Sequence, residues 1–364
     1  MTDPDLVRTF AEVSTRDRAL AGGKGASLGE LTGIGVEVPP GCVVTTGAFL
    51  RALAALDADG EIAEEIGRLD PDDGDAVARV TSRIRGRIAS VPLPDDLRDA
   101  IAGHCADLGG DGGSEGVPVA VRSSAADEDS PDASFAGLQD TYLWVRGGDA
   151  VVDHVRQCWA SLYNVESVTY RLRRRLPERG LAMGVVVQRM VDPRCAGVMF
   201  TRSPVTGDRS VVAIEGSWGL GSALVSGDVT PDTYLVSKVT GEIVRRTVSD
   251  KRRRHRMGPS GRGVLDEDVP NHLREKACLS DDDVGALVRM ARRVEEHYGC
   301  AQDIEWAISS GPDATVFLLQ SRPETAWAAR AAAPVAAPTA KPVDHVAKLL
   351  GGGAPGGRGR EATR

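Results

Sequence analysis

Aromatic residues are scarce in this sequence, at 4% of its 364 residues. An interior with few large rings must be filled by the aliphatic residues that bring the apolar share to 41%. That share is sufficient for a buried core, and the length is typical of one large domain or two ordinary ones. We therefore expect a globular protein whose core rests on Val, Leu, Ile and Ala.

Positive charge is also in short supply, since 44 Lys and Arg face 52 Asp and Glu, giving a formal net charge of -8. Nucleic acids recruit basic surfaces, so this balance argues against a nucleic-acid partner. Two basic runs, 171–175 and 251–256, interrupt the acidity. We interpret them as a solvated helix face and a solvated loop rather than as phosphate-binding sites.

Cysteine metal motifs, a signal peptide and long apolar runs are missing as well. The six cysteines form no C-x-x-C pair and have no histidine at metal spacing, which indicates reduced thiols in a cytosol. The first residues are acidic where a signal peptide would be basic. No uninterrupted apolar run reaches the ~18 residues that a membrane span requires. These features predict a cytoplasmic protein with no membrane partner.

Helices and short strands alternate along most of the chain. A helical stripe follows Ser280, a good N-cap with Asp283 three residues later. The β-rich runs are 184–190, 196–200, 211–214, 234–238, 304–308 and 315–320. This mixture indicates an α+β or α/β architecture.

Composition divides the chain into three expected parts. A Gly-rich turn at 109–116 separates an N-terminal lobe (1–110) from the main body (111–327). From residue 328 the sequence becomes rich in Ala and Pro, and then in Gly and Arg. Such a stretch cannot bury enough apolar surface to fold, so we predict a disordered tail or linker over 328–364.

The segment 303–322 is the most informative local feature. Strand alternation places Asp303 and Glu305 on one face, and Gln320 and Arg322 together on the returning strand. Antiparallel pairing would gather two carboxylates, an amide and a guanidinium over one surface. That set suits Mg²⁺ and the phosphates that the metal bridges. A half-exposed hairpin with a merely polar outer face is an equally weighted alternative.

Two basic segments lie nearer the N-terminus. Lys24 stands among glycines that let backbone N–H groups approach an anion, but the segment is not a P-loop and also fits a flexible turn. Arg122 leaves an apolar strand, where its charge requires an anion. A nucleotide would meet that need, with the loop around Gly137 folded over it. A salt bridge to Asp127 or Glu128 is the alternative.

A third segment, 185–190, is an apolar strand that turns polar at Gln188. Apolar walls and backbone hydrogen bonds at the exit of such a strand would suit an adenine, and an ordinary core strand fits the same pattern. Further on, Glu215 provides another carboxylate beside a glycine-rich turn.

The order of these pieces is more specific than any one of them. The chain contains, in succession, Gly-Gly-Lys-Gly-Ala-Ser, Val-Arg-Ser-Ser, Ser-Phe-Ala-Gly, Gln-Arg-Met, Gly-Val-Met-Phe-Thr-Arg, Trp-Gly-Leu-Gly, Asp-Ile-Glu-Trp and Leu-Gln-Ser-Arg-Pro-Glu-Thr. This succession resembles the N-terminal ATP-binding domain of the phosphoenolpyruvate synthase and pyruvate phosphate dikinase family, which rifampicin phosphotransferases share. The resemblance implies an α+β fold of ATP-grasp type, with mixed or antiparallel sheets and the nucleotide between two lobes.

The resemblance also implies roles for single residues. The ATP phosphates would be contacted by Lys24, Arg122 and Arg322. The segment that closes over them would contain Gly137, Gln139, Asp140 and Thr141. The adenine would be framed by Gln188, Arg189 and Met190, with Glu215 at the ribose. Mg²⁺ would be held by Glu305 and Gln320, with Asp303 as a further ligand.

In that family the domain phosphorylates a histidine on a separate swivelling domain, using the β-phosphate of ATP and releasing AMP. None of the six histidines here lies in the Thr- and Gly-rich context of that carrier, and no barrel domain for pyruvate is present. We therefore expect a transferase module that acts with a partner protein carrying the phosphohistidine and the acceptor site. The final acceptor would be pyruvate, a phenol or an antibiotic.

Two other functions are compatible with the same motifs. A carboxylate–amine ligase would form an acyl phosphate and release ADP, and a nucleotide sensor would bind ATP without chemistry. Phosphoryl transfer depends on positioning and on neutralising charge more than on covalent help from the protein. Because Lys24, two arginines and a metal set would supply both, we favour the transferase.

Overall fold

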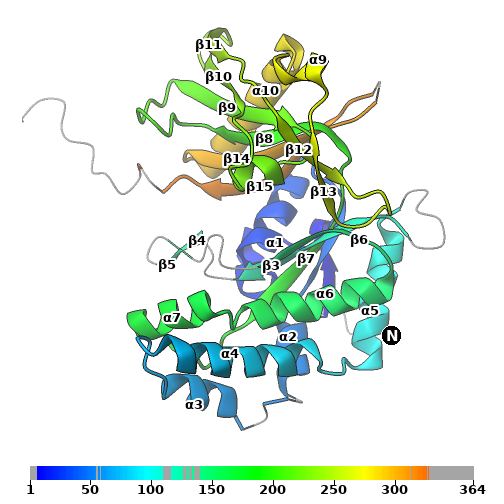
Figure 1. The fold of residues 1–364 in the computed structure, drawn as a ribbon, viewed down its shortest axis with the longest axis vertical. Coiled ribbons are helices and arrows are strands. Elements are labelled where there is room, and N and C mark those ends of the chain that lie inside the picture. Colours follow the sequence, from blue (N-terminus) through cyan, green and yellow to red (C-terminus); the bar gives the residue numbers. More distant parts are fainter. Residues whose placement is uncertain are drawn as a thin grey trace, which may run out of the picture. The chain divides into compact units, whose positions relative to one another are not determined.

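The computed structural model describes residues 6–54, 56–57, 59–109, 116–125, 140–311, 313–325 and 327, together with the backbone of 129–130 and 133–134. Contacts divide the chain into one unit that ends at Glu324 and another that begins at Thr325. The helices and strands described below all belong to the first unit (Figure 1). The predicted tail over 328–364 lies outside the described residues, and the predicted three-part division stays a prediction.

The first sheet has five antiparallel strands in the order β1-β2-β7-β3-β6. Their bounds are Val7–Thr9 for β1, Gly41–Val44 for β2, Met183–Arg189 for β7, Val119–Ala125 for β3 and Thr141–Val145 for β6. The central strands β3 and β7 are almost wholly buried, because helices pack on both faces of this sheet. Strands buried on both faces read as continuous apolar runs, as Val185 to Val187 does.

One face of the first sheet carries a single helix, α1 (Arg18–Gly33), which packs on Val43 and Val186. The opposite face carries the larger core, in which Phe49 and Trp159 meet edge to face. The helices on this opposite face are α2 (Thr46–Ala54), α3 (Glu61–Gly67), α4 (Gly74–Ala89), α5 (Asp95–Asp107), α6 (Gly148–Ser161) and α7 (Val165–Arg174). Short 3-10 turns at Phe10–Glu12 and Thr15–Asp17 precede α1 and contact it. The α1 face is therefore the side of the sheet that remains open to the rest of the unit.

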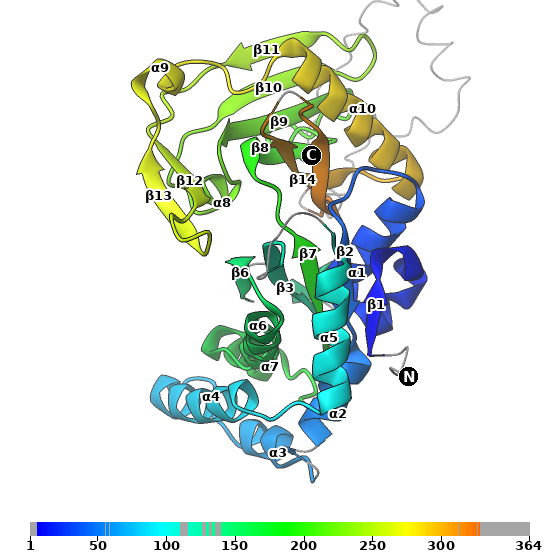
Figure 2. The same ribbon diagram turned by 90° about the vertical axis from the view of Figure 1, so that its right-hand side faces the viewer.

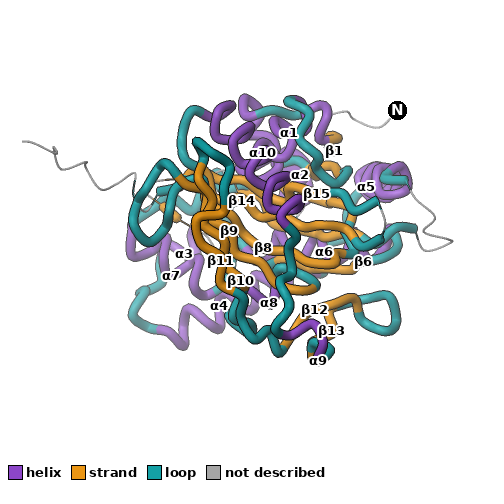
Figure 3. Tube along the Cα trace, turned by 90° about the horizontal axis from the view of Figure 1, so that it is seen from above, coloured by secondary structure: helices purple, strands orange, loops and turns teal. Residues whose placement is uncertain are grey.

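The second sheet has six antiparallel strands in the order β11-β10-β9-β8-β14-β15. Their bounds are Ile243–Thr247, Asp232–Ser237, Val211–Trp218, Pro193–Phe200, Gln302–Ser309 and Val316–Pro323. Helix α10 (Asp281–Tyr298) packs along one face of this sheet, against Ile304, Trp306 and Ile308 (Figures 2 and 3). The chain crosses directly from the first sheet to the second between β7 and β8.

Smaller elements complete the unit. They are α8 (Ser222–Val225), α9 (Asn271–Arg274), the hairpin β12 (Arg253–Met257) and β13 (Val264–Asp268), and the two-residue strands β4 (Asp129–Ser130) and β5 (Ala133–Ser134). Among the described residues, no helix is both long enough and apolar enough to cross a bilayer. All six cysteines are free thiols.

The sequence-based expectations of secondary structure are confirmed in their main points. The mixture of helices and antiparallel sheets is α+β. All six β-rich runs fall on strands of the two large sheets. Ser280 caps α10 in a capping box with Asp283, and the predicted apolar stripe of this helix is buried.

The interpretation of both basic runs as solvated surface is wrong at the first residue of each run, and the second run is not a loop, because Arg253–Met257 form strand β12. The Arg171 side chain is 1% exposed and pairs with Glu178, while Lys251 is fully buried against Asp232. Each cation pairs with a carboxylate outside its own basic run. The composition of the run alone therefore does not predict the pair. The remaining arginines of the first run are exposed, as expected.

Asp232 is the centre of a buried polar junction beneath β9 and β10. One carboxylate oxygen accepts hydrogen bonds from Lys251 Nζ at 2.6 Å and from the Ser249 N–H at 2.9 Å, and the other accepts from the Cys278 N–H at 2.8 Å. Three donors from two separate chain segments therefore converge on one carboxylate that solvent does not reach.

We predict that Asp232→Ala lowers the free energy of unfolding by about 3–5 kcal/mol, because it leaves the Lys251 ammonium buried without a counter-charge. Urea unfolding followed by far-UV circular dichroism measures the loss. The matched control is Asp96→Ala, which breaks the exposed, solvent-screened Arg51–Asp96 pair and should change the stability far less. Equal losses in the two variants would contradict the role given to Asp232.

Candidate functional site

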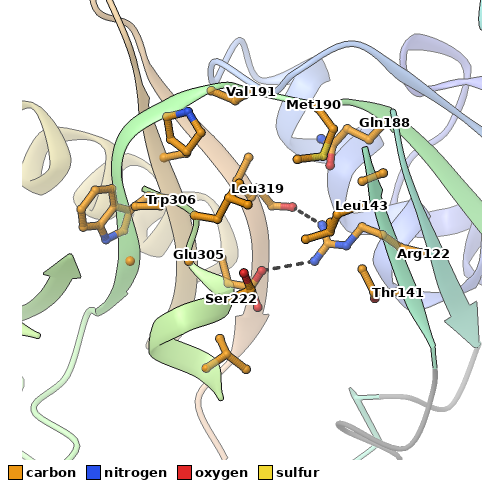
Figure 4. A pocket seen from close by; sticks show the side chains of 18 of the residues that line it. Arg122, Thr141, Leu143, Gln188, Met190, Val191, Ser222, Glu305, Trp306 and Leu319 are labelled. Atoms are coloured by element: carbon orange, nitrogen blue, oxygen red, sulfur yellow. Dashed lines mark hydrogen bonds and ion pairs between the residues drawn. The ribbon is translucent and has the colours of Figure 1, made fainter. Parts of the chain in front are cut away.

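A cavity of about 340 Å³ lies between the two large sheets (Figure 4). One wall comes from the α1 face of the first sheet and includes Arg122, Thr141 and Gln188. The other wall comes from the second sheet, on the face opposite α10, and includes Val198 and Glu305. The crossing between β7 and β8 closes one side. The lining is mostly apolar with a few polar side chains, which is typical of small-molecule sites.

The register of the first sheet places its polar side chains on this wall. Arg122 pairs with Thr141 on one side and with Val186 on the other, and Ala120 pairs with Gln188. Directly opposed residues of antiparallel strands share a face, so these side chains point the same way. Gln188 is 3% exposed and donates from Nε2 to the Pro39 carbonyl at 3.3 Å.

The second wall contains a row of side chains that crosses four strands. Glu215 of β9 pairs with Val198 of β8, Val198 pairs with Glu305 of β14, and Glu305 pairs with Gln320 of β15. These residues are separated by up to about a hundred positions in sequence and share one face because of the register alone. The predicted metal set and the predicted ribose contact thus lie on the same surface.

A β-bulge next to Glu305 gives β15 an extra residue. Glu305 pairs with Gln320, but Trp306 already pairs with Leu318, so Leu319 has no directly opposed residue. The Leu319 carbonyl instead accepts a hydrogen bond from Arg122 Nη1 at 2.9 Å. The bulge therefore turns a backbone acceptor of the second sheet toward the first.

Arg122 joins the two walls of the cavity. Besides Leu319, its guanidinium donates from Nη2 to Gln320 Oε1 at 2.6 Å and to Glu305 Oε2 at 3.2 Å. The Arg122 side chain is 12% exposed, whereas that of Glu305 is 40% exposed. The alternative partners Asp127 and Glu128 lie outside the described residues. Figure 4 shows the contacts of Arg122 with Glu305 and Leu319 across the cavity.

Helix α1 brings Lys24 close to the same strand. Lys24 is 6% exposed and its Nζ donates to the Ser123 carbonyl at 2.7 Å, next to Arg122 in sequence. The start of the helix is fixed by Ser124, whose Oγ donates to the Ala21 carbonyl at 2.8 Å and accepts from the Gly25 N–H at 3.0 Å. These contacts position a lysine at the boundary of the cavity, although Lys24 does not line it.

The same helix is tied to the second sheet. Ser27 Oγ donates to the Ser321 carbonyl at 3.0 Å, between Gln320 and Arg322 on β15. Helix α1 is thus bonded to β3 near its beginning and to β15 one turn later. One helix therefore carries Lys24 and holds both the strand of Arg122 and the strand of Gln320 and Arg322.

Asp303 and Arg322 form a cross-strand pair beside this helix. Arg322 Nε lies 3.6 Å from Asp303 Oδ2. Burial raises the pKa of Asp303 to about 6 although Arg322 opposes the shift, and the neighbouring Glu324 carboxylate adds to it. Asp303 Oδ1 is buried and has no hydrogen-bond partner among the described residues. An unsatisfied buried carboxylate oxygen of this kind is a reasonable ligand position.

The structure brings most of the predicted site residues together. Those that line the cavity are Arg122, Thr141, Gln188, Arg189, Met190 and Glu305. Those that border it without lining it are Lys24, Glu215, Asp303, Gln320 and Arg322. Asp140 instead accepts a hydrogen bond from the Tyr142 hydroxyl at 2.9 Å. Gly137 and Gln139 lie outside the described residues.

Sequence reasoning missed two segments of the cavity lining, and the first runs from Val191 to Val198. Leu220, Gly221 and Ser222, at the start of α8, form the second. The sequence signal was present in Trp-Gly-Leu-Gly, but that motif was interpreted only through Glu215. Gly219 has a φ of +78°, and a Cβ there would lie 2.4 Å from the His255 carbonyl, so the turn requires glycine.

The oxygen donors at this site fit a magnesium ion. Glu305 Oε2 and Gln320 Oε1 both reach the same nitrogen of Arg122, so they converge on one point. Within the described ranges no cluster of three or more His, Cys, Asp or Glu side chains offers a complete metal cage. Mg²⁺ does not need one, because it is commonly held by one or two carboxylates together with substrate phosphates and water.

Comparison with known proteins agrees with this geometry. The sequence profile of the family described as pyruvate phosphate dikinase, AMP/ATP-binding domain, matches residues 18–341. The chain belongs to this family. Membership supports ATP as the ligand of the domain, and it accounts for the order of motifs from Lys24 to Arg322.

Three similar proteins are longer than this chain. A probable phosphoenolpyruvate synthase of Methanothermobacter thermautotrophicus is 45% identical over 319 residues, which cover 88% of this chain and 46% of that protein. A rifampicin phosphotransferase of Streptomyces sp is 44% identical, covering 88% and 36%. The phosphoenolpyruvate synthase of Pyrococcus furiosus is 38% identical, covering 88% and 44%. The chain thus spans less than half the length of these relatives, which contain further sequence beyond the shared domain.

We predict that Gly22→Ala disrupts the kink inside α1 at this residue. Gly22 has a φ of +71°, and a Cβ there would lie 1.8 Å from the Ser124 carbonyl oxygen. The strained backbone alone should cost about 1–3 kcal/mol of unfolding free energy, and displacement of Lys24 should weaken ATP binding. Gly33→Ala, at the other end of α1, is the control, since a Cβ there meets nothing within 4 Å. Urea unfolding and calorimetry with ATP would contradict the prediction if the two variants behaved alike.

Proposed function

We propose that this chain is an ATP-grasp-type phosphotransferase module that moves a phosphoryl or pyrophosphoryl group from ATP to a histidine on a separate partner protein. The observation that carries the proposal is the Arg122 guanidinium, which spans the cavity and meets Glu305 and Gln320 of the opposite sheet. A buried cation between two sheets, next to a pair of converging oxygen donors, is an arrangement that a nucleotide triphosphate and its metal would complete.

The two sheets would enclose ATP in the manner of the two lobes of an ATP-grasp fold. The adenine would lie at Gln188, Arg189 and Met190, which line the cavity where the chain crosses between the sheets. Glu215 would reach the ribose from the row it shares with Val198 and Glu305. Residues from Gly137 to Thr141 would close over the phosphates; Thr141 already lines the cavity.

Lys24, Arg122 and Arg322 would hold the phosphates. Their cationic groups come from α1, β3 and β15, and the hydrogen bonds from Lys24 to Ser123 and from Ser27 to Ser321 hold α1 against both strands. Preorganised cations are effective because they stabilise negative charge without having to reorient during the reaction. In the present arrangement Arg122 is neutralised by Glu305, and a phosphate oxygen would replace that carboxylate as its partner.

Mg²⁺ would be held by Glu305 and Gln320, with Asp303 as a further ligand. The metal would supply neutralisation of the charge that develops on the transferred phosphoryl group. The chain's own contribution is to present these oxygens in register, which the cross-strand pair Glu305–Gln320 does. Asp303 contributes a buried oxygen that no described donor satisfies.

A separate phosphohistidine is supported by the positions of the described histidines. None of the five that the structure describes, namely His104, His154, His255, His272 and His297, lines the cavity. His104 and His154 bond to carbonyls in their own helices, and His297 bonds to Glu30. The acceptor histidine would therefore come from outside the described residues, and we propose that a partner protein supplies it in a phosphoenolpyruvate-synthase-like reaction.

The same ATP site is compatible with more than one final acceptor of the phosphate. The relatives include phosphoenolpyruvate synthases and rifampicin phosphotransferases, so pyruvate, an antibiotic or a phenol would each be consistent with the same ATP site. A carboxylate–amine ligase is the alternative that uses a similar fold, and its nucleotide product is ADP rather than AMP.

The nucleotide product distinguishes these functions. We predict that ATP is converted to AMP only when a protein with a Thr- and Gly-rich histidine domain is present. With β-labelled ATP the label should appear on that protein. Ion-exchange chromatography of the nucleotides provides the measurement, and ADP as the main product would favour the ligase. ATP turnover that is the same with and without every candidate partner would count against the proposal.

Arg122→Ala and Arg322→Ala should reduce turnover far more than ATP affinity. If these contacts strengthen as charge develops, each loss should lower kcat by about 100-fold or more while the Kd for ATP changes only a few-fold. Steady-state kinetics and calorimetry give the two numbers. Arg51→Ala, which removes an exposed arginine paired with Asp96, is the control and should leave both unchanged. Equal losses in kcat and affinity would show that the two arginines only bind the nucleotide.

A further inference from the structure

The hairpin of β12 and β13 belongs to neither large sheet and reaches from the second sheet toward β6 (Figures 1 and 2). Its base is attached to the second sheet through Lys251, just before β12, which is buried against Asp232 of β10. Its middle is attached to the segment that follows β9, where the Leu220 N–H donates to the His255 carbonyl at 2.9 Å. The hairpin therefore has a rigid root on one wall of the cavity.

The tip of the hairpin is bonded to the first sheet at Arg146, whose carbonyl also accepts a long hydrogen bond from Arg262 Nη1 of the hairpin turn, at 3.5 Å. Arg146, which directly follows β6, donates from Nε to the Gly261 carbonyl and from Nη1 to the Gly116 carbonyl, both at 3.0 Å. Gly261 lies in the hairpin turn, and Gly116 lies just before β3. A single planar fork thus connects the hairpin tip to the strand that carries Arg122.

The middle of the hairpin touches the cavity wall. His255 Nδ1 lies 2.9 Å from Ser222 Oγ, and Ser222 lines the cavity. Figure 4 shows Ser222 near Glu305, facing Arg122 and Thr141. Movement of the hairpin would therefore displace Ser222 on one side of the cavity. It would also change the contact with the end of β6, whose Thr141 and Leu143 line the opposite side.

The charges within the hairpin are neutralised by its own strands. Arg253 pairs with Asp266 and Asp268, and Arg254 pairs with Glu267. Because these cross-strand pairs do not involve the first sheet, the hairpin keeps its shape whether or not its tip is attached. The attachment at Arg146 can break and re-form while the hairpin moves as a unit.

We propose that the β12–β13 hairpin is a strap across the cavity, and that Arg146 is a positioning residue that fastens its tip so that the two sheets stay closed on a bound nucleotide. The crossing between β7 and β8 joins the sheets covalently on one side of the cavity, and the strap joins them reversibly at the β6 edge. The consequence for a nucleotide, which rests on the proposed function, is slower release.

Two measurements on Arg146→Ala test the strap. In the absence of nucleotide, trypsin should cut after Arg256 and Arg262 on the order of tenfold faster, since the tip has lost the guanidinium that connects Gly261 to Gly116. With Mg²⁺ and a fluorescent N-methylanthraniloyl ATP analogue, the dissociation rate should rise by a similar factor. The urea midpoint should stay close to that of the parent protein, because the core does not include this contact.

Two further variants serve as comparisons. Arg146→Lys keeps the charge but lacks the fork that spans both carbonyls, so it should resemble Arg146→Ala in both measurements. Arg245→Ala removes an exposed arginine from β11 and should resemble the parent protein. Unchanged proteolysis in Arg146→Ala, or parent-like behaviour of Arg146→Lys, would overturn the strap.

The two proposals fail in different ways. If the parent protein does not bind the ATP analogue, the proposed function fails while proteolysis still tests the strap. If the analogue binds and Arg146→Ala releases it at the parental rate, the assignment of Arg146 as a positioning residue fails and the nucleotide site stands.

Discussion

The guanidinium of Arg122 sets the main electrostatic constraint on this molecule. It is a permanent charge in the middle of the buried strand β3, and its acceptors, Leu319, Gln320 and Glu305, all belong to the other sheet. A charge in such a place is costly unless it is paired, so the two sheets are held face to face by the need to satisfy it. The cavity between them is the space left around that contact.

The rest of the site is arranged around this cation by backbone features. The bulge in β15 directs the Leu319 carbonyl at Arg122, and the register of β14 and β15 places Glu305 beside Gln320. Helix α1 then bonds to both β3 and β15, which keeps Lys24 near Arg122. These are small-residue and hydroxyl contacts, so the precision of the site comes from close approach rather than from bulky packing.

The polar residues outside the cavity divide into those that anchor and those that can move. The Asp232–Lys251 pair is wholly buried, and Asp232 also accepts from the Cys278 N–H, so the pair acts as a fixed root for the region that follows β11. The tip of the β12–β13 hairpin, by contrast, is attached at Arg146 by hydrogen bonds to backbone carbonyls. The base of the hairpin is therefore fixed, whereas its tip can detach. This difference is the physical basis for reversible closure of the cavity.

The sequence by itself determined the strands, the capped helix α10, the α+β class and the family, because alternation, capping and the order of motifs are local properties of the chain. It also placed Asp303 and Glu305 on one face of a hairpin. Only the tertiary structure decided that Glu215 shares their surface, that Arg122 meets Glu305 across 183 positions, and that Arg171 and Lys251 are buried in ion pairs. Those outcomes depend on strand register and on partners far away in sequence, and no local pattern encodes either of them.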